Sequence, residues 1–282
     1  MQKLGQHFLK NQKVSLKIID ALALGIGDTI FEIGPGHGEL TELLKKSATV
    51  ISANDKKNRG IKIICIEKDE DLCELLKKHF DGDEQIEITS GDALKLLPRL
   101  VSKYQNTDDE YKLVGNIPYY ITGHLFRVIS ELKNKPGKCV FMVQREVAER
   151  ITAQPPKMNR LAASVQFWAE PKIIVNVPKT DFRPAPKVDS AVLLFERKND
   201  SELCNTNDYY ATVRAIFGQP RKTVLNNIYT DRTETEKSKN PVRKKGDLIS
   251  ALENIGVNPE SRPQNLSIDD IKNISAAFFK NR

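Results

Sequence analysis

The sequence predicts an α/β fold, a Rossmann-like sheet of mainly parallel strands, followed by a small all-α domain. Strand and helix patterns alternate over residues 14–200, which is typical of parallel strands whose connecting helices cover both faces of a sheet. A glycine-rich turn follows the first strand, and strand patterns disappear after about residue 198. We therefore expect one domain over 1–198 and a helical domain over 199–282, in keeping with roughly 100–200 residues per domain.

The first domain is predicted element by element. Helical periodicity or an acidic first turn predicts helices over 14–22, 38–46, 69–80, 94–103 and 122–132. Short runs rich in β-branched residues predict strands over 29–34, 61–67, 85–92, 111–116 and 138–144. The last two strands, 173–178 and 191–197, have no helix between them, so we expect an antiparallel end to the sheet. Residues 48–60 look like an insertion before the second strand.

The second domain is expected to contain four helices, over 208–218, 221–229, 244–256 and 267–280. Residues 230–243 are polar and lack aromatic side chains, which predicts a mobile loop. The whole chain carries a net charge of +7, and residues 213–245 hold nine Arg/Lys against three acidic residues. This local excess favours a polyanion as partner, with Arg221 and Lys222 contacting phosphates; a solvated helical face is the alternative.

Composition argues against several classes of protein. No apolar run approaches the roughly 18 residues of a membrane span, and the first residues lack the apolar stretch of a signal peptide, so a cytoplasmic protein without membrane contact is expected. The cysteines lack metal-ligand spacing and are too few for a disulfide framework in a chain this long, so we expect no metal site. They are Cys65, Cys73, Cys139 and Cys204.

A glycine cluster lies where the first strand turns into a helix. Glu32, Gly34, Gly36 and Gly38 form the pattern E-x-G-x-G-x-G, whereas a dinucleotide fingerprint would place its third glycine at position 39, which is glutamate here. An acidic residue beside the turn suits a cationic ligand better than a pyrophosphate. The pattern therefore favours S-adenosylmethionine over NAD as cofactor; a purely structural glycine turn is the alternative.

A carboxylate after the second strand is expected to bind the ribose hydroxyls of this ligand. Glu67 and Asp55 are both candidates, and we favour Glu67 because it ends the better strand and a helix follows directly. Asp92, after the third strand, is placed to accept a hydrogen bond from the adenine amine. The structural alternatives are a helix-capping role for Glu67 or Asp92 and a solvated turn for Asp55.

The segment 114–122 places Asn116, Ile117, Pro118 and Tyr119 at the carboxyl end of the fourth strand, where open α/β sheets bind their ligands. The Asn116 side-chain oxygen and the Ile117 carbonyl can accept the two hydrogens of an adenine amine, which draws its lone pair toward a methyl donor. Pro118 has no N–H to compete for that carbonyl, and Tyr119 offers an aromatic face to the base. A simple proline turn is the alternative.

An adenine must leave its stack to reach such a site, and stacking on aromatic side chains offsets part of that cost. Phe182, in a proline-rich segment, is our candidate for a second aromatic face. The alternative is an ordinary hydrophobic plug.

These motifs jointly resemble the ribosomal RNA adenine N6,N6-dimethyltransferases, over nearly the whole chain. The resembling segments are LGQHFLKN, FEIGPGHGELT, IEKDEDL, GDAL, GNIPYYIT, VQREVAERI, FRPAPKVDSAV and FGQPRKTVLNNI. The resemblance implies a class I methyltransferase fold and a donor pocket lined also by the residues Gln6, His7, Leu9, Lys68, Ala93 and the catalytic Asn116. Tyr120 departs from the family pattern, since many members carry Asn there, and Pro220 interrupts a usually more basic run.

The resemblance further implies a function and a partner. We expect dimethylation of two adjacent adenines in the 3′-terminal hairpin loop of small-subunit (16S) ribosomal RNA, within a late precursor particle, by a monomeric enzyme. A large-subunit (23S) RNA methyltransferase of the Erm type is the nearest alternative. A non-catalytic RNA-binding assembly factor of the same fold is the second, and a nicotinamide oxidoreductase is a distant third.

Overall fold

The computed structural model describes residues 7–53, 60–104, 110–199, 205–235 and 245–279. The chain divides into two compact units. Unit 1 comprises Met1–Glu149 and Glu170–Arg197, and unit 2 comprises Arg150–Ala169 and Lys198–Arg282. Residues 150–169, which lie inside the expected first domain, thus group with the helical unit.

Unit 1 is built on a seven-stranded sheet in the order β4-β3-β2-β5-β6-β9-β7. Its strands are β2 (Thr29–Ile33), β3 (Lys62–Glu67), β4 (Ile86–Ser90), β5 (Tyr111–Asn116), β6 (Lys138–Gln144), β7 (Ala169–Val177) and β9 (Ser190–Arg197). The five strands β4, β3, β2, β5 and β6 pair in parallel, whereas β9 pairs antiparallel with β6. The predicted parallel sheet with an antiparallel end is therefore confirmed.

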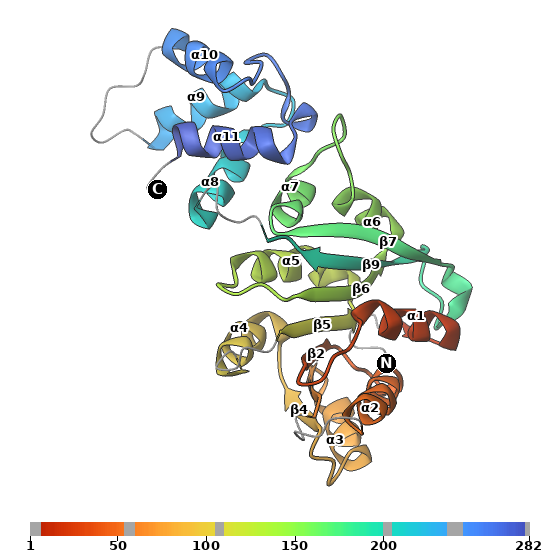
Figure 1. Cartoon of the computed structure of the whole chain (residues 1–282). Coiled ribbons are helices and arrows are strands. Elements are labelled where there is room, and N and C mark those ends of the chain that lie inside the picture. The colour runs from red at the N-terminus through yellow and green to blue at the C-terminus, as the bar shows by residue number, and fades with distance from the viewer. Residues whose placement is uncertain (1–6, 54–59, 105–109, 200–204, 236–244, 280–282) are drawn as a thin grey trace. The chain divides into compact units, whose positions relative to one another are not determined.

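Helices cover both faces of this sheet. They are α1 (Gln12–Leu22), α2 (Glu39–Ser52), α3 (Glu70–His79), α4 (Ala93–Tyr104) and α5 (Thr122–Glu131). A further helix, α6 (Arg145–Ile151), follows β6 and contains the boundary between the two units. Helices α1, α2 and α3 lie on one side, and α4 and α5 on the other (Figure 1). Successive side chains of a strand point to opposite faces of the sheet. In β2, Ile30 belongs to the apolar core shared with α1 and α2, whereas the ring of Phe31 contacts Tyr104 of α4 on the other face.

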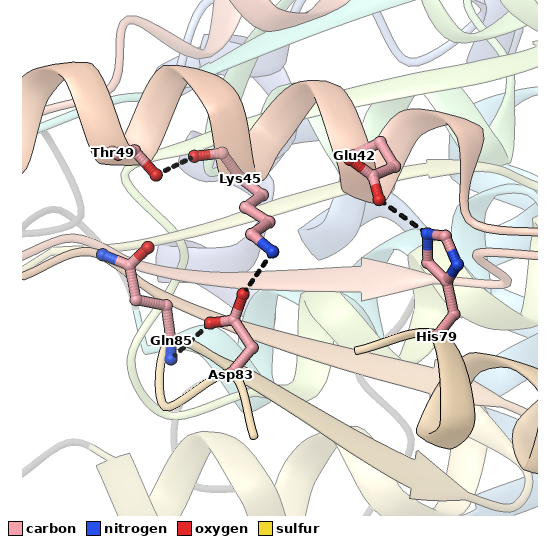
Figure 2. A network of polar contacts seen from close by, with 6 residues as sticks. All are labelled: Glu42, Lys45, Thr49, His79, Asp83 and Gln85. Atoms are coloured by element: carbon pink, nitrogen blue, oxygen red, sulfur yellow. Dashed lines mark hydrogen bonds and ion pairs between the residues drawn. The ribbon is translucent and has the colours of Figure 1, made fainter. Parts of the chain in front are cut away.

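Polar contacts fix α2 against the end of α3 and the turn that follows it (Figure 2). His79 lies 2.6 Å from the Glu42 carboxylate, and the Lys45 ammonium lies 2.7 Å from Asp83, whose other oxygen accepts the Gln85 backbone N–H. Lys45 also lies over the Phe80 ring. Because α2 begins at the glycine turn, these contacts hold the helix that carries one wall of the cavity described below.

Unit 2 contains α7 (Arg160–Gln166), α8 (Thr206–Ile216), α9 (Val224–Thr235), α10 (Lys245–Asn254) and α11 (Ile268–Phe278). The four helices expected after residue 199 are confirmed. Helix α7 packs on α8, since the Tyr209 hydroxyl donates to the Ala163 carbonyl at 2.9 Å and the Tyr209 ring stacks on Phe167 at 3.9 Å. In the described part of the chain, no helix is long and apolar enough to cross a membrane.

Three local predictions need correction. Helix α2 continues through 48–52, which we expected to be insertion, and α9 continues to Thr235, into the expected loop. Helix α7 and a two-stranded antiparallel sheet of β1 (Phe8–Leu9) with β8 (Phe182–Arg183) were not predicted. Each of these elements is short or polar, so neither its propensity nor its periodicity distinguishes it from a loop.

Candidate active site

One cavity opens at the carboxyl ends of β2, β3 and β5, where parallel sheets bind their ligands. The glycine turn after β2, the end of β3 and the turn after β5 each form a wall, and the segment around β1 forms another. The predicted residues that line this cavity are His7, Leu9, Glu32, Gly34, Gly36, Glu67, Asn116, Ile117, Pro118 and Tyr119. Sequence positions more than 100 residues apart therefore meet in one place.

The glycine turn requires glycine most clearly at Gly36. Its backbone has φ +62°, and a Cβ there would lie 2.8 Å from the Phe8 ring. Its N–H donates to Glu67 Oε2 at 3.1 Å. The absent side chain thus lets the turn approach both the β1 segment and the end of β3.

Glu67 ends β3 and is 4% exposed. Its Oε2 accepts the Gly36 N–H, and its Oε1 accepts the N–H groups of Lys68 at 2.8 Å and Asp69 at 3.0 Å. These three bonds fix the carboxylate. Because each carboxylate oxygen can accept two hydrogen bonds, one acceptor position remains, on Oε2. A hydroxyl group of a ligand in the cavity can donate to it.

Glu32 is a carboxyl group buried in the floor of the cavity. Desolvation by burial raises its pKa to about 7, although the Thr41 hydroxyl donates to Oε2 at 2.6 Å and the Cys65 thiol lies 3.6 Å away. The charges of Glu39 and Glu67 raise the pKa of Glu32 further. Among the described residues no cationic group pairs with this buried carboxyl, which suits it to a cationic ligand.

Asn116 is the last residue of β5. Its Nδ2 donates to the His7 backbone carbonyl at 2.8 Å, and among the described residues no group donates to its Oδ1. The Ile117 N–H donates to the Met142 carbonyl at 3.0 Å, which ties the turn to β6. The amide orientation is thus set by the β1 segment, and the oxygen remains available to accept a hydrogen from a ligand amine.

Tyr119 follows this turn and is half-buried. Its hydroxyl forms a 2.9 Å hydrogen bond with Ser190 Oγ, and its ring centroid lies 6.0 Å from that of His7. Burial raises the pKa of the Tyr119 hydroxyl, so this group stays protonated at neutral pH. The ring is therefore held in place as an aromatic wall.

A smaller cavity adjoins the main one and shares Gly34, Glu67 and Pro118 with it. Lys68, Asp92 and Ala93, the remaining predicted donor-pocket residues, line this cavity. Asp92 Oδ1 accepts the Leu94 N–H at 3.0 Å, as a capping residue does, and Oδ2 lies 3.4 Å from the Lys68 ammonium. One oxygen of the Asp92 carboxylate thus caps the helix, and the other contacts the Lys68 ammonium.

Phe182 is not where we expected it. It is 3% exposed, belongs to the apolar core and pairs with Leu9 between β8 and β1. Its ring therefore has no free face for a base, and the hydrophobic plug is the interpretation that fits. The prediction that Phe182 offers a second aromatic face to the base is therefore wrong.

Four other candidates lie away from the cavity or outside the described residues. Gln6 and the rejected alternative Asp55 lie outside the described residues. Arg221 and Lys222 are exposed in the turn that precedes α9, in unit 2. The structure therefore places both basic side chains in solvent.

Ser190 and Glu39 are two site residues that sequence reasoning missed. Ser190 holds the Tyr119 hydroxyl from β9, 71 residues further along the chain, and no local signal identifies such a partner. Glu39 lines the main cavity at the first residue of α2. Glu39 could have been identified from the sequence, because it occupies the position of the third glycine of a dinucleotide fingerprint.

The described residues fit a ligand that carries a diol, a cationic end and a purine. Glu67 offers a fixed carboxylate, Glu32 a buried carboxyl that a cation would ionise, and Asp92 a carboxylate oxygen in the smaller cavity. Gly36 provides the close backbone approach. Asn116 and Tyr119 line the main cavity, where they can bind a second ring that carries an amine.

Comparison with known proteins gives concordant results. The family model "Ribosomal RNA adenine dimethylase" matches residues 1–252. Proteins named "Ribosomal RNA small subunit methyltransferase A" are similar: that of Dehalococcoides mccartyi is 35% identical, covering 99% of this chain and 88% of the relative, and that of Streptococcus thermophilus is 33% identical, covering 97% and 90%.

Solved structures agree in fold. The dimethyladenosine transferase from Plasmodium falciparum has a TM-score of 0.74 and 26% identity, covering 96% of this chain and 99% of that one. The 23S rRNA methyltransferase ErmE has a TM-score of 0.67 at 21% identity, covering 96% and 99%, and shows likeness of fold alone.

Proposed function

Because this chain belongs to the ribosomal RNA adenine dimethylase family, we propose that it methylates two adjacent adenines of small-subunit ribosomal RNA. The chain is an S-adenosylmethionine-dependent ribosomal RNA adenine N6-dimethyltransferase. Its target is the 3′-terminal hairpin loop of 16S RNA in a late precursor particle, and the product is N6,N6-dimethyladenosine. Relatives at 31–35% identity, all named for the small subunit, support this target over the large-subunit RNA.

The observation that carries the mechanism is the bond from Asn116 Nδ2 to the His7 carbonyl. It engages one of the two N–H groups of the amide and fixes the orientation of the side chain, so the oxygen can accept a hydrogen of the adenine amine. With the Ile117 carbonyl as second acceptor, the amine lone pair is drawn out of conjugation with the ring. Catalysis by these groups is positioning and electrostatic stabilisation.

The donor side uses the three carboxyl groups. When bound, S-adenosylmethionine supplies a methyl group on positively charged sulfur. Glu67 would hold ribose hydroxyls, Asp92 would accept from the adenine amine, and Glu32 would be ionised beside the cationic end of the donor. The hydrogen bonds, the burial and the raised pKa of Glu32 given above support these roles.

Tyr119 binds the extruded acceptor base by its ring. Extrusion costs a few kcal/mol, and stacking on an aromatic ring returns about 1–3 kcal/mol per base. Because burial keeps the Tyr119 hydroxyl protonated and bonded to Ser190, this group is no general base. The methylated amine is acidic and loses its proton to water.

Phosphate contacts are assigned to the basic surface of unit 2 that includes Arg221 and Lys222. Both side chains are exposed, which is the condition for meeting a polyanion. The enzyme acts as a monomer, in the cytoplasm, where precursor particles of the small subunit are available.

The test is methyl transfer to small-subunit precursors by wild type, Asn116→Ala and the control Asn134→Ala. Asn134 is an exposed asparagine of unit 1 outside the cavity. We expect Asn116→Ala to lower kcat at least about a hundredfold with unchanged donor affinity in calorimetry, and Asn134→Ala to match wild type. Retained turnover in Asn116→Ala would remove this residue from the mechanism.

The RNA target is checked separately, by primer extension and mass spectrometry on both ribosomal RNAs. Dimethyladenosine in the small-subunit hairpin is the expected product. A primer-extension stop confined to the large-subunit RNA would overturn the proposed target, and failure to bind S-adenosylmethionine at millimolar concentration would favour a non-catalytic assembly factor.

A further inference from the structure

The smaller cavity has the chemistry of a purine slot. It lies beyond the ends of β2, β3 and β4, against the turn that follows β5. Its walls are partly apolar, from Ile33, Ile66, Ala93 and Ile121, and its polar groups are the Asp92 carboxylate and the Lys68 ammonium. An apolar slot with a carboxylate acceptor suits a flat ring that carries an amine.

Tyr120 is the aromatic side chain of this slot. It lines the smaller cavity and not the main one, whereas its neighbour Tyr119 lines the main cavity and not the smaller one. The two residues belong to a 3₁₀ turn, η1 (Tyr119–Ile121), in which successive side chains diverge by about 120° because there are three residues per turn. One short turn therefore directs two tyrosines to two different sites.

Tyr120 is unusually open to solvent for an aromatic residue, at 56% exposure. No ring contact or hydrogen bond connects its side chain to any other described residue, whereas Tyr119 is held by Ser190. A large side chain that is exposed at the rim of an apolar slot gains buried area when a ring fills the slot. The exposed Tyr120 ring is therefore suited to pack against a flat ring.

We propose that Tyr120 is a donor-side binding residue, which packs against the adenine ring of S-adenosylmethionine opposite the apolar wall formed by Ala93. The proposal rests on the function proposed above. It assigns to the donor side the position at which Tyr120 replaces the asparagine of many family members. The Lys68–Asp92 pair is half-exposed, so a purine amine can replace the ammonium as partner of Asp92 at little cost.

The test is calorimetric binding of S-adenosylhomocysteine and of adenosine to wild type, Tyr120→Phe and Tyr120→Asn. Leu75→Asn serves as the control, because Leu75 is an apolar residue of α3 with 44% exposure outside both cavities. We expect Tyr120→Asn to weaken both probes about five- to tenfold, Tyr120→Phe to keep wild-type affinity and Leu75→Asn to change nothing. Equal loss for both probes places the contact on the adenosine part that the two probes share.

The KM for RNA is measured on the same variants. An unchanged Kd for both probes with a raised KM for RNA in Tyr120→Asn would overturn the inference and assign Tyr120 to the acceptor. Thermal melting identifies a variant that fails to fold, in which case Tyr120→Leu, which keeps bulk and removes the aromatic ring, is tested against Tyr120→Phe. Absence of probe binding to the wild type would contradict the proposed function itself.

Discussion

Replacing Glu32 with glutamine is expected to stabilise the ligand-free protein at pH 8. The carboxyl group is buried beneath the cavity, and desolvation raises its pKa from 4.5 to about 7. Glutamine has nearly the same shape and can still accept the hydrogen bond of the Thr41 hydroxyl through its carbonyl oxygen. The substitution therefore removes the cost of ionisation while it keeps the packing.

The magnitude follows from the pKa of Glu32. A change of one unit in pKa corresponds to about 1.4 kcal/mol. The rise in the pKa of Glu32 from 4.5 to about 7 therefore means that ionised Glu32 lowers the free energy of unfolding by about 3 kcal/mol. Between pH 4.5 and 7 the folded protein binds more protons than the unfolded chain, and its stability falls as the pH rises through this window. Below the window the carboxyl group is neutral in both states, and above it the group is ionised in both.

The assay is urea denaturation of wild type and Glu32→Gln at intervals from pH 5 to pH 8.5. The stability difference in favour of the variant is expected to grow by about 3 kcal/mol across this range. Glu74→Gln, at an exposed position of α3, is the control and should show no such growth. A difference between wild type and Glu32→Gln that stays constant with pH would refute the reasoning from desolvation.

Three further predictions concern stability, base binding and RNA binding. Lys112→Met leaves Asp28 without its buried partner at 2.6 Å, so thermal melting should report a loss of about 3–5 kcal/mol, partly recovered by adding Asp28→Asn. Tyr119→Ala should raise the KM for RNA about ten- to a hundredfold, whereas Tyr119→Phe should change it little in steady-state kinetics. Reversing the charges of Arg221 and Lys222 should flatten the dependence of RNA affinity on salt concentration, measured by filter binding; an unchanged slope would contradict phosphate contact.

Much of the sheet could be predicted because its strands are short apolar runs separated by helices. The five parallel strands and the antiparallel β9 lie where β-branched runs predicted them. The cavity follows from topology, since the carboxyl ends of parallel strands meet at one edge. Glu32, Glu67 and Asn116 were therefore predictable from their positions at strand ends.

The remaining site contacts depend on pairings that no local pattern encodes. The bond between Asn116 and His7 joins residues 109 positions apart, and Phe182 is buried because β8 pairs with β1, a strand of two residues. The local sequence around a phenylalanine in a proline-rich segment is the same whether its ring faces a cavity or the core. Only the tertiary pairing decides between these positions.

The bond from Asn116 to His7 has a consequence for proteolysis. The carbonyl that orients the Asn116 side chain belongs to His7, next to β1. Strand β1 pairs with β8 and is not part of the seven-stranded sheet. A protease cut just after Leu9 would release the amide to rotate while the seven strands stayed paired. Such a clipped molecule would keep its sheet but lose the cavity wall formed by His7, Phe8 and Leu9, so both donor binding and turnover should fall.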